Sequence, residues 1–258
     1  MVKKDIVIGL GEIGKPILQL ISKSYPAVGY DINEKLMNTI KFKKYEKYQT
    51  RFIHVCIPYT NKFVQHVISL AKKFEPEGLV IHSTIRPTTT QKIQSSLKIP
   101  VIYSATRGVH RRMIYDLRRY TKFYAIAQNA NRSKWASSSY EKLMKKCDIK
   151  TKKMSSPIAL ELAKIVVDTS YYGWLINYAQ LSNMIAMKYK VNYDEMWSFA
   201  DEIHKFLRNR PKMFPGFIGG HCVIPNLALI EDDTLNLIKI INSDYGRILH
   251  KRKTKIKN

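Results

Sequence analysis

The residues best suited to chemistry lie in the stretch GFIGGHCVIPNL, at positions 216–227. Gly219 and Gly220 directly precede His221 and Cys222, and prolines lie on both sides. Such a bent backbone presents a thiol, whereas an inert cysteine usually sits among aliphatic residues of a strand or helix. Cys222 is therefore a nucleophile, a metal ligand or a bystander.

A metal site and a disulfide framework are both disfavoured. The three cysteines are far apart without a CxxC pair, and the seven histidines show no metal-ligand spacing. We therefore expect no metal, and the cysteine usage suits a reducing cytoplasm.

A second group of charged residues follows helical spacing. Glu161, Lys164 and Asp168 lie three and four residues apart, which places them on one face of a helix. The simplest reading is a solvated stripe of ion pairs. However, the surrounding residues are largely apolar, which favours a central helix whose charges face a cleft or a partner.

The third group is the glycine motif GxGxxG, formed by Gly9, Gly11 and Gly14. It follows an apolar run and opens a helical pattern, as a dinucleotide-binding loop requires. Asp31 ends the next expected strand, where a carboxylate accepts hydrogen bonds from ribose hydroxyls and repels a 2′-phosphate. NAD is therefore favoured over NADP, although the nearby Lys35 leaves NADP open.

The surrounding pattern predicts the elements that position these groups. Short apolar runs alternate with helical segments up to about residue 154, which predicts an α/β, Rossmann-like doubly wound parallel sheet. From residue 155 the pattern becomes helical. Ser156 and Pro157 form a start signal for a long helix, followed by a second helix and by a third from about residue 227. We expect a cofactor domain over residues 1–154 and an all-helical domain over residues 155–258, in which the long apolar helix favours dimerisation because a chain of this size would not cover it fully. The expected strands cover residues 5–11, 27–32, 51–58, 78–84, 100–105 and 122–128.

Composition restricts the compartment and the partners. No apolar run is long enough to span a bilayer and the N-terminus has no signal-peptide pattern, so we expect a cytoplasmic protein without a membrane partner. The net charge is +24, with a dense basic cluster only in the tail from Arg247 to Asn258. Nucleic acid is an open but disfavoured partner, because no recognised nucleic-acid-binding motif is present and AT-rich codon usage alone produces Lys-rich chains. A small anionic substrate would be attracted by the same field.

At this point the chain resembles a known family. The segments GLGEIG, VGYDI, VIHSTIRPTTT, ELAKIVVDTSYYGWLINYAQ and GFIGGHCVIPNL occur in the order found in the UDP-glucose/GDP-mannose dehydrogenase family. The resemblance implies a homodimer that oxidises a sugar alcohol to an acid with two NAD⁺, through a thioester on a cysteine. It also implies that this chain is a short form, without the C-terminal domain that binds the nucleotide of the sugar.

The resemblance assigns roles to individual residues. Cys222 is expected to be the nucleophile, and Lys164 is expected to stabilise the oxyanion. Ser83 and Thr84 match a segment near the nicotinamide, although they are also suited to capping the helix after the fourth strand. The expected cofactor contacts are Gly9, Gly11, Glu12, Ile13, Gly14, Asp31, Pro58, Ser83 and Thr84.

The sequence also departs from the family pattern. Asp168 replaces the usual Asn, and Asn226 replaces the usual Asp, so the carboxylate and the amide have exchanged places. We expect Asp168 to handle protons. The two glutamates that the family has after the fifth strand are absent. His110 stands where the second glutamate would be. This histidine is either a general base or a surface residue among Arg107, Arg111 and Arg112.

Three functions are consistent with these residues. The first is an NAD-dependent dehydrogenase that acts on a sugar or nucleotide-sugar alcohol through covalent Cys222 chemistry. The second is a one-step dehydrogenase of the β-hydroxyacid type that leaves Cys222 unused. The third is a catalytically inactive NAD-binding or regulatory module.

Overall fold

The computed structural model describes residues 2–256, with side chains up to residue 251. The chain divides into two compact units, residues 1–164 and 165–258. The boundary thus follows Lys164, whereas the sequence pattern changes after residue 154. Residues 257 and 258 and the side chains from 252 onward, which form most of the basic tail, lie outside the described part.

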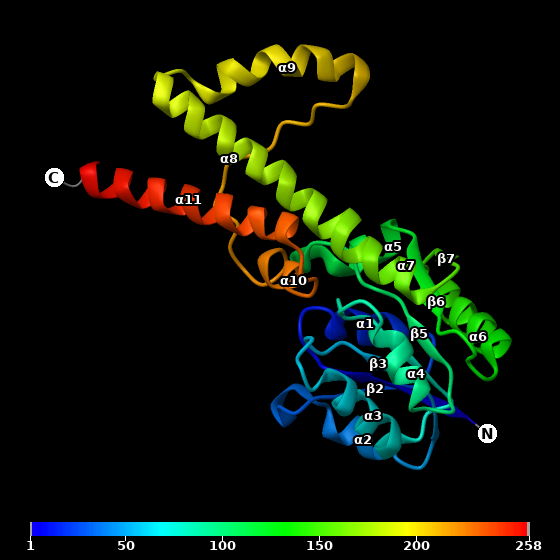
Figure 1. Cartoon of the computed structure of the whole chain (residues 1–258). Coiled ribbons are helices and arrows are strands. Elements are labelled where there is room, and N and C mark those ends of the chain that lie inside the picture. Colours follow the sequence, from blue (N-terminus) through cyan, green and yellow to red (C-terminus); the bar gives the residue numbers. More distant parts are fainter. Residues whose placement is uncertain (1, 257–258) are drawn as a thin grey trace. The chain divides into compact units, whose positions relative to one another are not determined.

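Unit 1 is built on a seven-stranded sheet with the order β2-β1-β3-β4-β5-β6-β7 (Figure 1). Strands β1 to β5 are parallel, which confirms the predicted Rossmann-like α/β class. The strands are β1 (Lys3–Ile8), β2 (Ala27–Tyr30), β3 (Gln49–Val55), β4 (Gly78–Ile81), β5 (Val101–Tyr103), β6 (Lys122–Ile126) and β7 (Thr151–Lys153).

The last two strands differ from the fully parallel sheet that we expected. Strand β6 runs antiparallel to β5, and β7 is parallel to β6. The connection between β5 and β6 contains the single turn η2 (His110–Arg112) and the short helix α5 (Met113–Arg119), which is about 10 Å long at 1.5 Å per residue. The chain therefore enters β6 from the edge at which it left β5. This places Lys122, the first residue of β6, at the carboxyl edge of the parallel strands.

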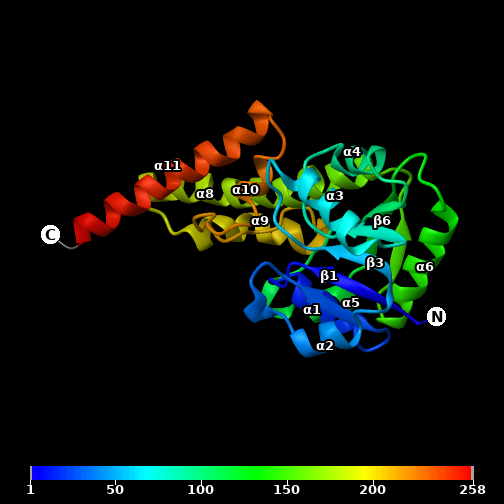
Figure 2. The same cartoon turned by 90° about the horizontal axis from the view of Figure 1, so that it is seen from below.

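Helices cover both faces of the sheet, which gives two apolar layers. One layer packs α1, α5 and α6 against side chains such as Val7 and Val80. The other packs α3, α4 and α7 against Ile6 and Ile81. Figure 2 shows α3 and α4 on one side of the strands and α1 and α5 on the other. Besides α5, the helical elements of unit 1 are α1 (Gly14–Ile21), η1 (Glu34–Leu36), α2 (Thr39–Lys44), α3 (Phe63–Phe74), α4 (Thr89–Ser95), η2 (His110–Arg112), α6 (Ser133–Lys146) and α7 (Pro157–Leu162).

The chain order of the strands reverses direction at β1. From β1 the chain passes to β2 on one side, and it then crosses to β3 on the other side of β1. In open α/β sheets, ligands bind at the carboxyl ends of the strands at this reversal. The carboxyl ends of β1 and β3 are therefore the expected position of a cofactor.

Unit 2 is helical, as predicted. A π-helical segment η3 (Ala163–Ser170) follows α7, and unit 2 continues through α8 (Tyr171–Tyr189), α9 (Tyr193–Leu207), α10 (Ile224–Leu227) and α11 (Asp233–Ile256). The third long helix thus starts at Asp233, later than the expected start near residue 227. Helices α8 and α11 lie side by side (Figures 1 and 2). Among the residues described, no helix has the length and hydropathy needed to cross a membrane.

Candidate functional site

Each of the three positions of the GxGxxG loop requires glycine for a different physical reason. Gly9 has φ of +86°, a conformation that side-chain-bearing residues rarely adopt. A Cβ at Gly14 would lie only 1.7 Å from the carbonyl oxygen of Gly9, so α1 packs against the loop too closely for any side chain. A Cβ at Gly11 would meet nothing within 4 Å. Gly11 therefore leaves open space beside the backbone, as the close approach of a pyrophosphate would require.

Asp31 follows β2 and is held at the glycine loop by backbone donors. Its Oδ2 accepts a hydrogen bond from the Leu10 N–H at 2.6 Å, and its Oδ1 accepts one from the Asn33 N–H at 2.9 Å. These bonds fix the carboxylate beside the loop but use only part of its acceptor capacity. The loop and the carboxylate together have the form that the sequence predicted for a dinucleotide site.

The other expected cofactor contacts lie after β3 and β4. Ser83 is buried, and its hydroxyl donates to the Ile57 carbonyl at 2.6 Å, which ties the two neighbouring strand ends together. Thr84 is half-buried and Pro58 is exposed. Helix α4 begins only at Thr89, so the alternative of Ser83 as its cap is wrong for this residue.

The cap of α4 is instead Glu161 from α7. Its carboxylate accepts hydrogen bonds from the Thr88 and Thr90 N–H groups, at 2.6 and 3.0 Å, and also from the Thr90 hydroxyl. Glu161 is fully buried, whereas Lys164 is half-buried and Asp168 is exposed. The expected stripe of three charges on one face is therefore wrong for Glu161. The π-helical turns of η3 also change the spacing that an α-helix would give to Lys164 and Asp168.

His110 lies in the connection after β5 and reaches the glycine loop. Its Nδ1 is 2.7 Å from Oε2 of Glu12, the residue that follows Gly11. Glu12 is more than half exposed, whereas His110 is 28% exposed. The pairing joins two residues that the sequence named separately.

Lys122 is a buried cation that the sequence did not indicate. Its Nζ donates to the carbonyls of Ser104 and Ala105, at 3.0 and 3.3 Å, and to the Thr106 hydroxyl at 3.2 Å. Burial lowers the pKa of its amine to about 7, and the neighbouring Arg107 and Lys164 charges act in the same direction. Only the direction of β6 places this lysine at the carboxyl edge, and that direction is not visible in the local pattern.

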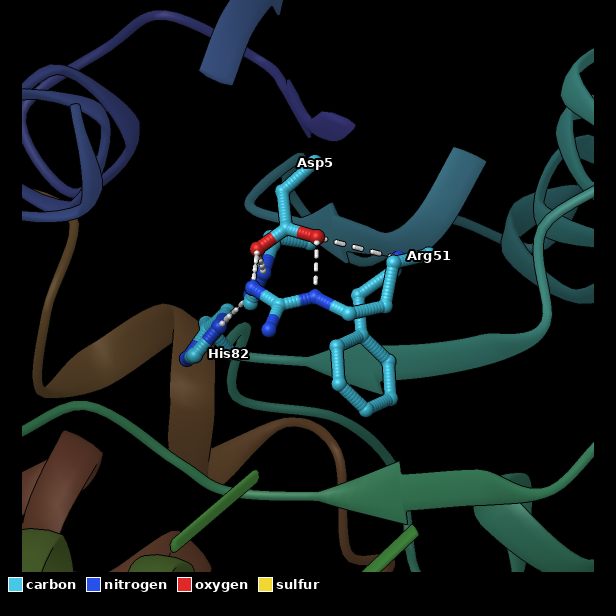
Figure 3. A network of polar contacts seen from close by, with 5 residues as sticks. Asp5, Arg51 and His82 are labelled. Carbon is cyan, nitrogen blue, oxygen red and sulfur yellow. Dashed lines mark hydrogen bonds and ion pairs between the residues drawn. The ribbon is translucent and has the colours of Figure 1, made fainter. Parts of the chain in front are cut away.

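A polar network also crosses the apolar layer under α1 (Figure 3). Arg51 lies at an irregularity in the β1–β3 register and donates through Nε to Asp5 at 3.0 Å. His54 Nε2 is 3.7 Å from the same carboxylate, and its Nδ1 is 3.0 Å from Nε2 of His82. Burial alone would raise the pKa of Asp5, but His54 and Arg51 outweigh it and hold the pKa below its usual range. Burial lowers the pKa of His82 well below its usual value.

In unit 2, the segment before Cys222 is irregular but firmly anchored. The side-chain amide of Asn242, from α11, accepts from the Ile218 N–H at 2.8 Å and donates to the Ile218 carbonyl at 3.0 Å. Gln180, from α8, donates to the Gly216 carbonyl at 2.7 Å and to the Asn242 side chain at 3.0 Å. Both amides are buried. They fix the course of the chain just ahead of the glycines.

Cys222 itself is exposed at the bend that the sequence predicted. Gly220 has φ of +74°, so the turn before the thiol depends on glycine. After the bend, Val223 packs against a small core that contains Leu227 and Ile238, and Asn226 lies half-buried in α10. The thiols of Cys56 and Cys147 differ from that of Cys222 because neither is exposed. Burial raises the pKa of Cys56 to about 12 and that of Cys147 to about 11.

No family model matches the chain, and no curated protein matches its sequence. Solved structures do match. A UDP-D-ManNAc dehydrogenase from Pyrococcus horikoshii aligns over 98% of this chain and 72% of its own, with a TM-score of 0.75 and 19% identity. A UDP-N-acetyl-mannosamine dehydrogenase from Staphylococcus aureus aligns over 98% of this chain and 71% of its own, with a TM-score of 0.75 and 15% identity. The resemblance expected from the sequence is thus confirmed at the level of the fold.

A third solved structure is matched over a larger share of its own chain. The 3-hydroxyisobutyrate dehydrogenase from Mycobacterium tuberculosis aligns over 98% of this chain and 94% of its own, with a TM-score of 0.60 and 13% identity. The same architecture therefore occurs in dehydrogenases of two kinds.

Proposed function

We propose that this protein is an NAD-dependent dehydrogenase that oxidises the alcohol of a sugar or nucleotide sugar. The observation that supports it most is the glycine loop, with space beside Gly11 and the Asp31 carboxylate bonded to the Leu10 N–H. The shared fold with sugar-nucleotide dehydrogenases is in agreement. A small anionic substrate also suits the net charge of +24.

The residues of the loop fit a dinucleotide. In the proposal, backbone N–H groups at the start of α1 bind the pyrophosphate, and Asp31 accepts hydrogen bonds from the ribose hydroxyls. The Asp31 carboxylate would repel a 2′-phosphate, which favours NAD over NADP. NAD⁺ supplies the hydride acceptor, and complete oxidation of an alcohol to an acid uses two molecules of it.

The covalent chemistry is assigned to Cys222. After the first oxidation, its thiolate attacks the aldehyde carbon, a C–S bond forms and the carbonyl oxygen gains the negative charge. The Lys164 ammonium is proposed to stabilise this oxyanion. The second oxidation leaves a thioester, and water then breaks the C–S bond to release the acid and the thiol. Asp168 is proposed to take up the protons that are released, Asn226 to hydrogen-bond the intermediate and His110 to act as a base.

A one-step oxidation is the second candidate. It is favoured by the match to 3-hydroxyisobutyrate dehydrogenase, which nearly coincides with this chain in extent. In this case a single hydride leaves the substrate, the product is a carbonyl compound and Cys222 takes no part.

We also propose that the protein forms a homodimer through unit 2. Helices α8 and α9, with the residues that follow α9, line a wide pocket of about 560 Å³ that contains Leu175, Trp197 and Phe199. Several apolar side chains of α8, two of which line this pocket, are at least 40% exposed, namely Tyr171, Tyr172, Tyr178, Leu181, Ile185 and Tyr189. An apolar surface of this kind is typical of an interface between subunits. A monomer by light scattering at micromolar concentration would contradict this proposal.

The decisive experiment counts NADH. The purified protein is mixed with NAD⁺ and a panel of nucleotide sugars, sugar phosphates and small hydroxy acids. Two NADH per substrate, falling to one or none in Cys222→Ala, would support the covalent route, whereas one NADH with an active Cys222→Ala would support the one-step route.

Two further variants test single residues. Asp31→Ala should lose NAD binding, as measured by calorimetry. Unchanged turnover in Asp168→Asn would rule out the proton-handling role of Asp168.

Absence of NADH with every substrate, combined with NAD binding that depends on Asp31, would instead favour the binding or regulatory module. Absence of both would contradict the proposal at its first step.

A further inference from the structure

One part of unit 1 carries a large share of the positive charge of the chain. Residues 104–153 contain 14 Lys and Arg but only 3 Asp and Glu, a net charge of +11 out of the +24 of the whole chain. Two of the three acids have partners here. Asp116 is buried and accepts from Arg112 at 3.1 Å, and Glu141 accepts from the Tyr124 hydroxyl. The surface formed by this part of the chain therefore favours an anionic partner.

Within this part, cations alternate with aromatic rings. The Arg107 guanidinium lies 5.1 Å from the centre of the Phe123 ring and 5.9 Å from that of Tyr120. Arg119 continues the series, at 5.7 Å from Tyr120 and 5.9 Å from Tyr115. At the other end, Lys152 lies 5.9 Å from Phe123. We refer to these six residues as the cation–aromatic ladder: Lys152, Phe123, Arg107, Tyr120, Arg119 and Tyr115.

The ladder is accessible at its outer members. The Tyr115 and Tyr120 side chains are 59% and 37% exposed, and Arg119 and Lys152 are also exposed. The Arg107 guanidinium donates to the Thr121 carbonyl at 2.7 Å, which orients the side chain without neutralising its charge. The ladder thus presents positive charge and exposed tyrosine side chains together, on α5, β6, the edge strand β7 and the connections beside them.

We propose that the cation–aromatic ladder binds single-stranded nucleic acid. Phosphates would pair with Arg119, Arg107 and Lys152, while bases stack on Tyr115 and Tyr120, which is how single strands are bound without sequence preference. The base faces of a duplex are stacked on one another and inaccessible, so a duplex would be bound only through its phosphates. This activity is independent of the dehydrogenase proposal, because it uses none of the glycine-loop residues.

The test measures fluorescence anisotropy of a fluorescein-labelled 20-nucleotide oligouridylate with the full-length protein at 100 mM salt. Two double variants remove the same charge: Arg119→Gln with Lys152→Gln inside the ladder, and Lys92→Gln with Lys98→Gln at exposed positions outside it. We expect about tenfold weaker binding from the first and less than about twofold from the second. Tyr115→Leu, which changes no charge, should weaken binding at least about fivefold.

Other results would overturn the proposal. A labelled duplex bound as tightly as the single strand, or equal losses in the two double variants, would mean that only diffuse charge attracts the oligonucleotide. Absence of binding at 50 mM salt would overturn it directly, and binding to anionic phospholipid vesicles but not to the oligonucleotide would assign the surface to a membrane instead. Unchanged thermal unfolding of each variant controls for folding.

Discussion

The glycine loop of unit 1 and the Cys222 segment of unit 2 both leave regular structure, but they are held in different ways. The loop is fixed by backbone contact: the Gly9 carbonyl lies where a Gly14 side chain would be, and Asp31 is tied to the Leu10 N–H. The Cys222 segment is fixed by side-chain amides of Gln180 and Asn242, which come from two different helices. The first arrangement follows from a local motif, whereas the second requires residues far apart in the sequence.

The largest expected effect is the loss of stability in Gly14→Ala, which tests whether the glycine loop is fixed by backbone contact. A Cβ at 1.7 Å from a backbone oxygen forces α1 away from the loop, and we expect a loss of stability of about 3 kcal/mol or more, or failure to fold. Gly11→Ala is the matched control, because its Cβ meets nothing; it should unfold at the wild-type temperature yet bind NAD at least about tenfold more weakly. Equal melting temperatures for the two variants would contradict the distinction.

A second prediction compares thiols in the two units. Because burial raises the pKa of Cys56 to about 12 and of Cys147 to about 11, few of these thiols are ionised at pH 8. Exposed Cys222 should therefore be alkylated by iodoacetamide at least about a hundredfold faster, as measured by peptide mass spectrometry over time. Cys222→Ser should remove the fast phase. Alkylation of Cys56 at a similar rate would contradict the assignment of its environment.

A third prediction concerns Asn242, whose side-chain amide holds the segment before Cys222. Asn242→Ala leaves the backbone N–H and carbonyl of Ile218 without their side-chain partner, which should cost about 2 kcal/mol. Hydrogen exchange should accelerate at Gly216 and Ile218 and remain unchanged in the glycine loop. Asn236→Ala, at an exposed position of the same helix, is the control and should change stability by less than about 0.5 kcal/mol. Equal effects of the two variants would show that the amide is not an anchor.

The fourth prediction concerns the pH dependence of stability and tests unit 1 alone. Lys122 has a pKa near 7 in the folded protein and about 10.4 when unfolded, so the unfolded chain binds more protons between these values. Stability should therefore rise with pH in this window. Between pH 6 and pH 9, the wild type should gain roughly 2 kcal/mol relative to Lys122→Met, as measured by chemical denaturation. A difference that stays constant with pH would mean that the amine does not titrate in this range.

What the sequence predicted well was encoded locally. The tight turn at Gly9, the close packing at Gly14, the start of α7 at Ser156 and Pro157, and the alternation of strands and helices all depend on neighbouring residues. The bend before Cys222 also followed from its glycines.

What the sequence did not reveal depends on distant partners. Glu161 caps α4 from more than seventy residues away, whereas its local spacing to Lys164 and Asp168 predicts a charged stripe. Lys122 looked like the polar start of a strand, because its burial depends on the antiparallel direction of β6. Strand β7, with the polar sequence Thr-Lys-Lys, carries no apolar signal at all. Nothing in the sequence next to Gln180 and Asn242 indicates the backbone groups that their side chains bind.

Strand β7 has a consequence for how copies of the protein behave in a concentrated solution. It is the outermost strand on its side of the sheet, and its free backbone edge would otherwise offer a template for another strand. The strand has only three residues, and Lys152 and Lys153 are both exposed. Two such edges approaching each other would bring four positive charges together over a very short ladder. The brevity and charge of β7 therefore protect the sheet from edge-to-edge aggregation.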